Sequence, residues 1–408
     1  MENIKKQMKN LKKERRNSYP ITNINSRWKI PIAYPDIGEE EARAVYEVVK
    51  SGWIKEGKKV QEFEDKFAEY IGVKHAIACI NGTVGLHLIL LAHGIGPGDE
   101  VIVPSMTFVS TVTSVLHVGA TPVFADIELQ TFNIAPKHIE KIIETDYKLE
   151  EKVRLINRKT EKRLKAIIPV HYGGQSADME SILSLAKRYN LYIFEDAAEA
   201  HGAEYKVKKV GTFGDAGMFS FTPTKNITTA EGGMITTNND EIAEKIKLLK
   251  NHGQDYEYRH ILIGYNYRMT EMQATIGIEQ LKKLPSIIVR KQENAKFLNS
   301  KLEKLHGITP PYVAPECNHT YMMYTIKIDS QKIGMSRDRL MKKLEEKGVQ
   351  TKIYFPPVHL QPIFRNMGCK DGMLPVTEAI SQQILSLPFH SKLTKEEIEY
   401  IVNIIKTR

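Results

Sequence analysis

Residues 217–233 read GMFSFTPTKNITTAEGG. The apolar start predicts a strand that delivers Ser220, followed by a loop that carries Lys225 and a second strand that the Gly-Gly pair opens. A lysine in a loop between two buried strands is not a solvated surface charge. It is either a nucleophile or a structural or phosphate-binding lysine, and the residues around it indicate which of these roles applies.

Strands alternate with helices before this stretch. The strands are apolar on both faces, which is typical of a mostly parallel sheet covered by helices on both sides. We therefore predict an α/β fold with a mostly parallel, seven-stranded central sheet. The predicted strands are 75–80, 100–104, 121–126, 165–171, 191–196, 216–221 and 233–237, and the predicted helices between them are 86–93, 108–117 and 179–189.

The 408 residues divide into three predicted parts. Residues 1–27 form a basic, polar N-terminal tail, residues 28–280 a large α/β domain, and residues 281–408 a smaller α+β domain. A helix predicted at 270–305 links the two domains. The charge-dense segment at about 146–164 is an insertion, which we predict to be a surface helix or another surface excursion.

Composition excludes several classes of protein. The chain is 42% hydrophobic and 26% charged, and no apolar run approaches the roughly 20 residues of a membrane span. The N-terminus lacks the apolar core of a secretory signal, and the three cysteines show neither a disulfide framework nor a zinc pattern. We expect a cytoplasmic enzyme with no membrane contact and no metal.

The net charge of +9 is confined to two segments. Residues 1–16 contribute +5 and residues 137–165 contribute +4, so the remaining chain is neutral. Charge confined to a tail and one insertion is typical of solvated faces. We predict no nucleic-acid partner, although a positive rim helps an anionic small substrate to approach.

Four features follow one another along the predicted sheet. Gly82 and Thr83 open a helix after a strand, where free backbone N–H groups bind anions. Phe108 presents a ring that either stacks on a flat cofactor or packs in the core. Asp196 ends a buried strand, where a carboxylate either needs a cationic partner or caps the next helix. Lys225 lies 29 positions after Asp196.

Each feature alone also fits an ordinary structural role. Together they match the requirements of pyridoxal 5'-phosphate: an anion cradle, a stacking ring, a carboxylate for the pyridine nitrogen and a lysine that forms a Schiff base. The order of these features therefore predicts a pyridoxal-phosphate site.

The same segments carry a resemblance to a known family. The motifs are NGT (81–83), SMTFVST (105–111), FEDAAEAHGA (194–203), MFSFTPTKNITTAEGGM (218–234) and GYNYRMTEMQATIG (264–277). In this order they resemble the DegT/DnrJ/EryC1/StrS sugar aminotransferases over residues 30–408. The resemblance implies a fold type I, pyridoxal-phosphate-dependent enzyme that aminates keto sugars carried on nucleotides.

The resemblance also implies a role for each site residue. Lys225 would form the Schiff base, Asp196 would pair with the pyridine nitrogen, Glu199 would lie near the ring hydroxyl, and Phe108 would stack on the ring. The phosphate would be bound by Gly82, Thr83 and Ser220, together with Asn266 of a neighbouring subunit.

Two further implications concern the assembly and the substrate. Sites of this family are built at a dimer interface, so the expected assembly is a homodimer with shared active sites. His359, in the segment FPPVHLQP (355–362), would contact the sugar; the alternative is a surface loop histidine.

Within the family, EDAAEAHGA, ITTAEGG and FPPVHLQP are most similar to the GDP-perosamine synthases. Those enzymes transfer an amino group from L-glutamate to C4 of GDP-4-keto-6-deoxy-mannose, a step in the biosynthesis of polysaccharides such as O-antigens. Amination at C3 or C4 of a UDP- or dTDP-linked or other keto sugar is an open alternative. So is a non-catalytic regulatory protein on the same fold, which only the basic tail supports.

One residue departs from the family pattern. Relatives usually have glycine where this chain has Ala230. Alanine is tolerated there if the local φ is negative.

Overall fold

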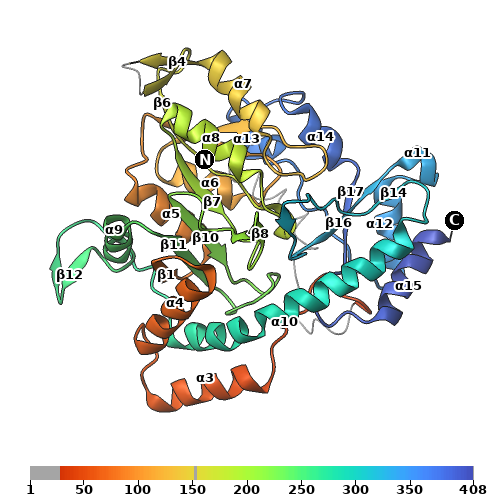
Figure 1. Cartoon of the computed structure of the whole chain (residues 1–408), viewed down its shortest axis with the longest axis horizontal. Helices are drawn as coiled ribbons and strands as arrows, with labels where there is room; N and C mark the ends of the chain where they lie inside the picture. The colour runs from red at the N-terminus through yellow and green to blue at the C-terminus, as the bar shows by residue number, and fades with distance from the viewer. Residues whose placement is uncertain (1–27, 151–153, 408) are drawn as a thin grey trace, which may run out of the picture.

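The computed structural model describes residues 28–150 and 154–407. Its centre is the predicted sheet, in the order β1-β11-β10-β7-β6-β2-β3 (Figure 1). The strands are β1 (His75–Cys79), β2 (Asp99–Pro104), β3 (Thr121–Ala125), β6 (Arg163–Ile167), β7 (Tyr192–Asp196), β10 (Ala216–Ser220) and β11 (Gly233–Thr237).

The sheet is mostly parallel, as predicted. β10, β7, β6, β2 and β3 pair in parallel, whereas β11 runs antiparallel to both β1 and β10. The carboxyl ends of β2, β7 and β10 therefore meet at one edge, which is where ligands bind in open α/β sheets.

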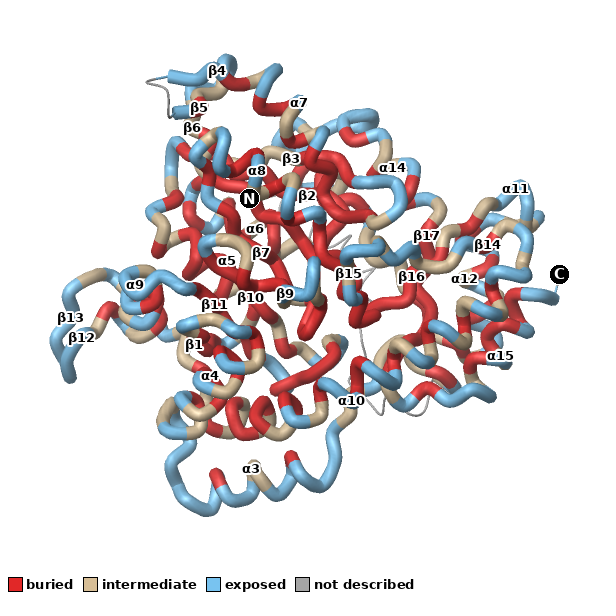
Figure 2. The backbone as a smooth tube through the Cα atoms, in the orientation of Figure 1, coloured by how far each residue is buried: buried red, intermediate tan, exposed pale blue. Residues whose placement is uncertain are grey.

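Helices cover both faces of the sheet, whose central strands are largely buried (Figure 2). Successive side chains of a strand point to opposite faces of the sheet. Met218 of β10 therefore packs in the core with α5, α6 and α9, whereas its neighbour Phe219 packs with α4 and α10. The helices of this domain are α3 (Glu39–Ser51), α4 (Lys58–Ile71), α5 (Gly82–Ala92), α6 (Ser110–His117), α7 (Pro136–Asp146), α8 (Met179–Tyr189) and α9 (Asp240–Lys250).

The insertion at about 146–164 does not form the helix that we considered for it. It contains a hairpin of β4 (Tyr147–Glu150) and β5 (Arg154–Asn157), and β5 joins the end of β6, so the sheet has nine strands. The hairpin is fixed by Glu100 of β2, which accepts hydrogen bonds from Tyr147 Oη at 2.5 Å and Asn157 Nδ2 at 3.0 Å. These hydrogen bonds and the burial of Tyr147 stabilise the strands, although the charge pattern of the segment suggested a helix.

The long helix α10 (Glu271–Leu302) links the two parts of the chain (Figure 1). Its N-terminal half packs on α4, and residues such as Ala295 and Leu298 pack in the core of the C-terminal part. The boundary that we placed at residue 280 falls inside this helix. Ile30 also lies in the C-terminal core and bridges to Val349, so the start of the described chain packs outside the large domain.

The C-terminal part is α+β, as predicted. A three-stranded antiparallel sheet, β14-β16-β17, packs against α12 and α15. Its elements are β14 (Ile308–Thr309), β16 (Tyr324–Ile328), α11 (Ser330–Ile333), α12 (Arg337–Glu346), α13 (Pro362–Asn366), α14 (Pro375–Ser381), β17 (Ile384–Leu387) and α15 (Lys395–Lys406).

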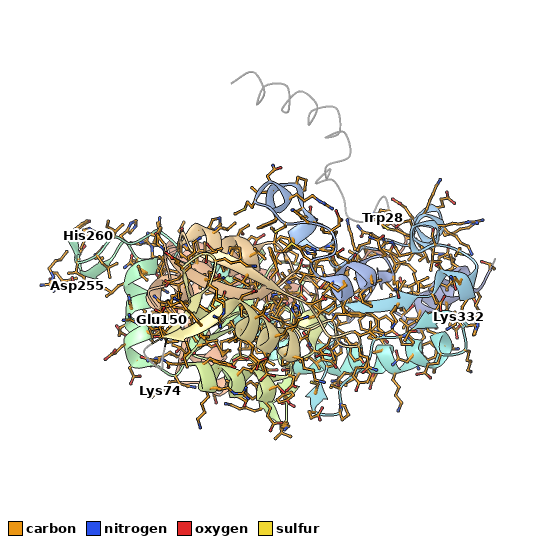
Figure 3. All side chains as sticks on the ribbon, turned by 90° about the horizontal axis from the view of Figure 1, so that it is seen from above. Trp28, Lys74, Glu150, Asp255, His260 and Lys332 are labelled. Carbon is orange, nitrogen blue, oxygen red and sulfur yellow. The ribbon has the colours of Figure 1, made fainter. Side chains whose placement is uncertain are left out.

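Several short elements complete the described chain. A small sheet joins β8 (Glu204–Tyr205), β9 (Lys208–Lys209) and β15 (Cys317–Asn318). The hairpin of β12 (Gln254–Tyr256) and β13 (Arg259–His260) projects from one end of the molecule, where Asp255 and His260 are labelled in Figure 3. Over the ranges 28–150 and 154–407, no helix is both long and apolar enough to cross a membrane.

Candidate functional site

A cavity of about 490 Å³ lies at the edge of the sheet where β2, β7 and β10 end. Segments of the C-terminal part close its opposite side through Met322, Phe355 and Phe389. The cavity brings together seven of the nine predicted site residues: Gly82, Thr83, Phe108, Asp196, Glu199, Ser220 and Lys225. Residues that lie more than 140 positions apart in the chain therefore share one chamber.

The N-terminus of α5 forms one wall of the cavity. The Asn81 side chain caps this helix by accepting a hydrogen bond from Val84 N at 3.0 Å, and the first backbone N–H groups have no partner within the helix. A Cβ at Gly82 would lie 2.9 Å from Met218 Sδ and 3.0 Å from Ser220 Cβ, so only glycine lets the helix approach β10 this closely. This end of α5 and Ser220 form a cradle suited to a phosphate.

Asp196 is a buried carboxyl group at the end of β7. It is 4% exposed and accepts hydrogen bonds from Thr111 Oγ1 at 2.7 Å and from Ala198 N at 3.2 Å. Burial raises the pKa of Asp196 despite these bonds. A cation placed against this group would stabilise its charged form, so it fits a protonated ring nitrogen.

A buried polar pair holds the strand that delivers Asp196. Ala177 N donates to His171 Nδ1 at 3.1 Å, so His171 Nε2 carries the proton and donates to Glu195 at 3.0 Å. Glu195 also accepts backbone N–H bonds from Gly211, Phe213 and Gly214 at 2.7–2.8 Å. These bonds fix the end of β7 and thereby the direction of the Asp196 side chain.

Glu199 and Lys225 lie side by side in the wall of the cavity. Lys225 Nζ lies 3.5 Å from Glu199 Oε1, and Gly173 N donates to Glu199 Oε2 at 2.9 Å. Burial raises the pKa of Glu199 although Lys225 acts in the opposite direction. The side chain of Lys225 is 11% exposed, so its amine points into the cavity and not into bulk water.

Phe108 lies at the mouth of the cavity and is 56% exposed. It makes an edge contact with Phe355 of the C-terminal part, with ring centroids 6.3 Å apart. A ring that remains this exposed is available for stacking on a flat ligand, so packing in the core does not account for its position.

Two predicted site residues lie outside this cavity. His359 is fully buried, and its ring nitrogens bond to Ser105 Oγ at 2.7 Å and Glu378 Oε1 at 3.2 Å. The alternative of a surface loop histidine is therefore wrong, and a sugar contact would require His359 to break these bonds. Asn266 is exposed, pairs with Asn251 in an isolated β-bridge and is not among the residues that line the cavity.

Several residues that shape the cavity were not predicted from the sequence. Thr111 holds Asp196 and lies in the quoted motif SMTFVST, so its position was a usable signal. The wall residues from the C-terminal part, Met322, Phe355 and Phe389, gave no such signal because only the tertiary fold brings them to the sheet edge.

Ala230 lies in the loop after Lys225 with φ of +68°, so the condition of a negative φ is not met. The left-handed conformation costs a residue with a Cβ about 1–2 kcal/mol. Replacing Ala230 by glycine should therefore raise the free energy of unfolding by about 0.5–1 kcal/mol, after the greater entropy of glycine in the unfolded chain is subtracted.

Chemical denaturation followed by circular dichroism measures this change. Ala230→Val is the matched variant and should lower the free energy of unfolding, since a β-branched side chain tolerates positive φ less well. Equal stability of the three proteins would show that the loop relaxes to another conformation.

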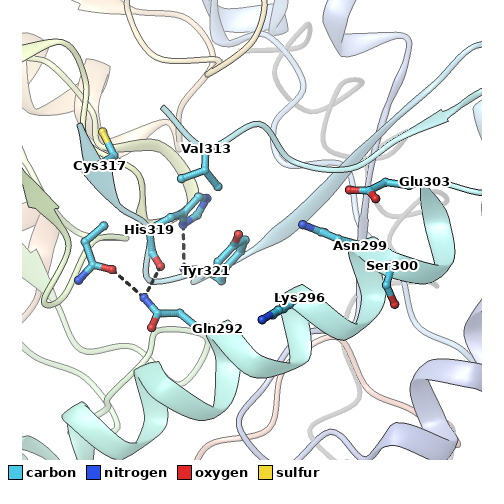
Figure 4. Close-up of a pocket in the computed structure, with 10 residues that line it drawn as sticks. Gln292, Lys296, Asn299, Ser300, Glu303, Val313, Cys317, His319 and Tyr321 are labelled. Atoms are coloured by element: carbon cyan, nitrogen blue, oxygen red, sulfur yellow. Dashed lines mark hydrogen bonds between the residues drawn. The ribbon is translucent and has the colours of Figure 1, made fainter. Parts of the chain in front are cut away.

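A second cavity, of about 510 Å³, lies along the outer side of α10 (Figure 4). Gln292 and Lys296 of the helix face His319 and Tyr321 across it, and Gln292 Nε2 donates to His319 O at 3.1 Å. It contains none of the residues that line the first cavity near Lys225. We therefore assign the chemistry to the first cavity.

The sheet order and the cavity at its edge define a fold type I, pyridoxal-phosphate-dependent transferase. The chain matches the DegT/DnrJ/EryC1/StrS aminotransferase family over residues 35–406 and belongs to that family. It is thus a sugar aminotransferase, and we do not retain the alternative of a non-catalytic regulatory protein.

Individual relatives support this assignment. The chain is 41% identical over 378 residues to GDP-perosamine synthase of Caulobacter vibrioides, covering 92% of this chain and 96% of that protein. It is 36% identical over 391 residues to the spore coat polysaccharide biosynthesis protein SpsC of Bacillus subtilis, covering 92% and 96%. A crystal structure of a DegT DnrJ EryC1 StrS aminotransferase from Brucella abortus matches with a TM-score of 0.82 at 33% identity, covering 90% of this chain and 94% of that one.

The residues present fit the cofactor of this family. The cradle at Gly82 and Ser220 suits its phosphate, the buried Asp196 suits its ring nitrogen, and the exposed ring of Phe108 suits its flat face. When bound, pyridoxal phosphate supplies a carbonyl group for a lysine and a ring that accepts the electrons of a broken bond at the amino-bearing carbon.

Proposed function

We propose that this enzyme transfers an amino group from L-glutamate to C4 of GDP-4-keto-6-deoxy-mannose. The observation that carries the proposal is the cavity in which Lys225, Asp196, Glu199 and the α5 cradle converge. The chain is 41% and 38% identical to GDP-perosamine synthases of two organisms, and this similarity favours the GDP-linked sugar over UDP- and dTDP-linked keto sugars.

In this proposal the residues divide the work. Lys225 Nζ would make the covalent link to the cofactor and, once released from it, would move the proton from the amino-bearing carbon of the donor to the former carbonyl carbon of the cofactor. Asp196 holds the ring nitrogen protonated, and Thr111 keeps its carboxyl group in place. Glu199 lies on the Lys225 side of the cavity, where it would meet the ring hydroxyl.

The proposed anion binding follows from the same geometry. The N-terminus of α5 and Ser220 would hold the phosphate, and Phe108, which lines the same cavity, would stack on the flat ring. Because these residues and Asp196 line the same cavity as Lys225, they would hold the cofactor where the Lys225 amine can react with it.

A substrate competition tests the proposed sugar. GDP-, UDP- and dTDP-linked 4-keto-6-deoxy sugars are offered together with L-glutamate, and the products are identified by mass spectrometry and the aminated carbon by NMR. We expect a GDP-linked 4-amino sugar. A UDP- or dTDP-linked product, or amination at C3, would contradict the proposed substrate and leave the aminotransferase assignment intact.

We also propose that the enzyme is a homodimer with shared active sites. Asn266 is exposed and lies outside its own cavity, between the projecting β12–β13 hairpin and α10. Large apolar side chains around it are exposed, and a second copy of the chain would cover them: Tyr256, Tyr258, Ile261 and Ile263.

Complementation tests whether Asn266 acts in the partner's site. Asn266→Asp would place a negative charge against the phosphate and should reduce activity at least about tenfold. When Asn266→Asp is mixed and refolded with inactive Lys225→Ala, mixed dimers contain one intact site, so about a quarter of wild-type activity should return. No recovery, with the mixed dimer verified by mass spectrometry, would show that Asn266 does not serve the partner's cofactor.

A further inference from the structure

Lys291 of α10 is a buried amine next to the active site. Its side chain is 3% exposed, and its Nζ donates to Asn226 Oδ1 at 2.8 Å and to Met322 O at 3.3 Å. Within residues 28–150 and 154–407, no carboxylate lies within ion-pair distance of Lys291. An ammonium group buried without a counter-ion is costly and is stabilised here only by neutral oxygens and by the Phe389 ring at 5.7 Å.

The partners of Lys291 connect three parts of the molecule. Asn226 directly follows Lys225, while Met322 and Phe389 line the active-site cavity from the C-terminal part. Asn226 Nδ2 in turn donates to Thr320 O at 3.2 Å. These bonds join α10, the loop that carries Lys225 and the segment 320–322, of which Met322 lines the cavity.

The surroundings of Lys291 leave its charge unbalanced. Burial lowers the pKa of Lys291 to about 7. The titratable groups that face it are His319 and His390 from the C-terminal part, whose pKa values burial lowers to about 3 and about 4. Since both histidines are neutral at pH 7, none of these groups supplies a negative charge.

We propose that Lys291 is a positioning residue that holds Lys225 in its reactive place by bonding Asn226 to α10 and to the cavity wall. The inference rests on the proposed role of Lys225. An apolar side chain such as methionine would fill the same volume without the cost of burying an amine, so packing alone does not explain a lysine at this position.

Three variants separate positioning from packing. Lys291→Met keeps the side-chain volume and removes the donors, and Lys291→Arg keeps the charge and the donors. Lys296→Met is the matched control, because Lys296 lies on the same helix but lines the outer cleft seen in Figure 4. Lys296 makes no contact with the Lys225 loop.

The first measurement is hydrogen exchange of residues 222–229 in the cofactor-free protein. We expect Lys291→Met to exchange at least about tenfold faster in this loop, with its melting temperature within a few degrees of wild type. Lys291→Arg should recover most of the protection, and Lys296→Met should match wild type. An unchanged loop in Lys291→Met, or faster exchange spread evenly over the whole protein, would overturn the proposal.

The second measurement is amino transfer. Misplacement of a reacting group by about 1 Å costs on the order of 100-fold in rate. Lys291→Met should therefore lose about 10- to 100-fold in kcat, whereas KM for both substrates stays within about threefold. A loss confined to KM would contradict positioning. If the wild type performs no amino transfer while the loop still loosens only in Lys291→Met, the proposed function is wrong and the positioning of Lys225 stands.

Discussion

Lys225→Ala is expected to lose amino transfer altogether, with turnover at least about 10³-fold below wild type. Among the residues that the structure describes, its amine is the only one that lines the cavity, and it lies 3.5 Å from the Glu199 carboxyl group. Alanine removes both the nucleophile and the base that moves the proton. The side chain has no other ion-pair partner among the described residues, so the fold should survive.

Two controls make the Lys225 result specific. Lys225→Arg keeps a positive charge opposite Glu199 but cannot form the covalent link, so it should fold normally and be as inactive as Lys225→Ala. Lys296→Ala, on the surface of α10, should keep wild-type turnover. Turnover is followed by release of 2-oxoglutarate from glutamate. Full turnover in Lys225→Ala would show that another amine performs the reaction.

Asp196→Asn is expected to reduce turnover by about 10²-fold or more. The amide keeps the shape of the carboxyl group and its hydrogen bond from Ala198 N, but it carries no negative charge. Without that charge the ring nitrogen is not held protonated, and the ring accepts electrons less well. Burial raises the pKa of Asp196, which means that the folded protein disfavours the charged form of this group. Removal of the carboxyl group should therefore not lower the melting temperature.

The variant Thr111→Val distinguishes the effect of the Asp196 charge from the effect of the hydrogen bond that holds this carboxyl group. This variant removes the 2.7 Å hydrogen bond to Asp196 but leaves the carboxyl group in the site. We expect a loss of about tenfold or less, clearly smaller than that of Asp196→Asn. The two variants are compared by kcat at saturating cofactor. Near-normal turnover in Asp196→Asn would contradict the proposed role of the charge.

The sequence predicted the sheet well because its strands are buried on both faces and read as apolar runs. The same reasoning missed α4, although Val60, Phe63, Phe67 and Ile71 recur with the spacing of a helix and pack in the core. The insertion was harder, because its charges suggested a solvated helix while buried Glu100 of a distant strand organises it as a hairpin.

The predicted site residues lie at or just after the ends of strands. The order of strands and helices along the chain is therefore enough to predict that these residues meet. His359 shows the limit of that reasoning. A histidine in a proline-rich loop looks accessible, but His359 is buried and bonds to Ser105, 254 positions earlier in the chain, and to Glu378. The strain at Ala230 could not be predicted either, because the sequence does not show that this residue has a positive φ.

The central claim is that Lys225 binds the cofactor covalently in the cavity at the sheet edge. The most direct measurement is borohydride reduction of the purified yellow enzyme, followed by proteolysis and mass spectrometry of the peptides. We predict that the pyridoxyl group is found on Lys225 alone and is absent from the Lys225→Ala protein. A pyridoxyl group on a different lysine of the wild-type enzyme, or none after incubation with pyridoxal phosphate, would contradict the account.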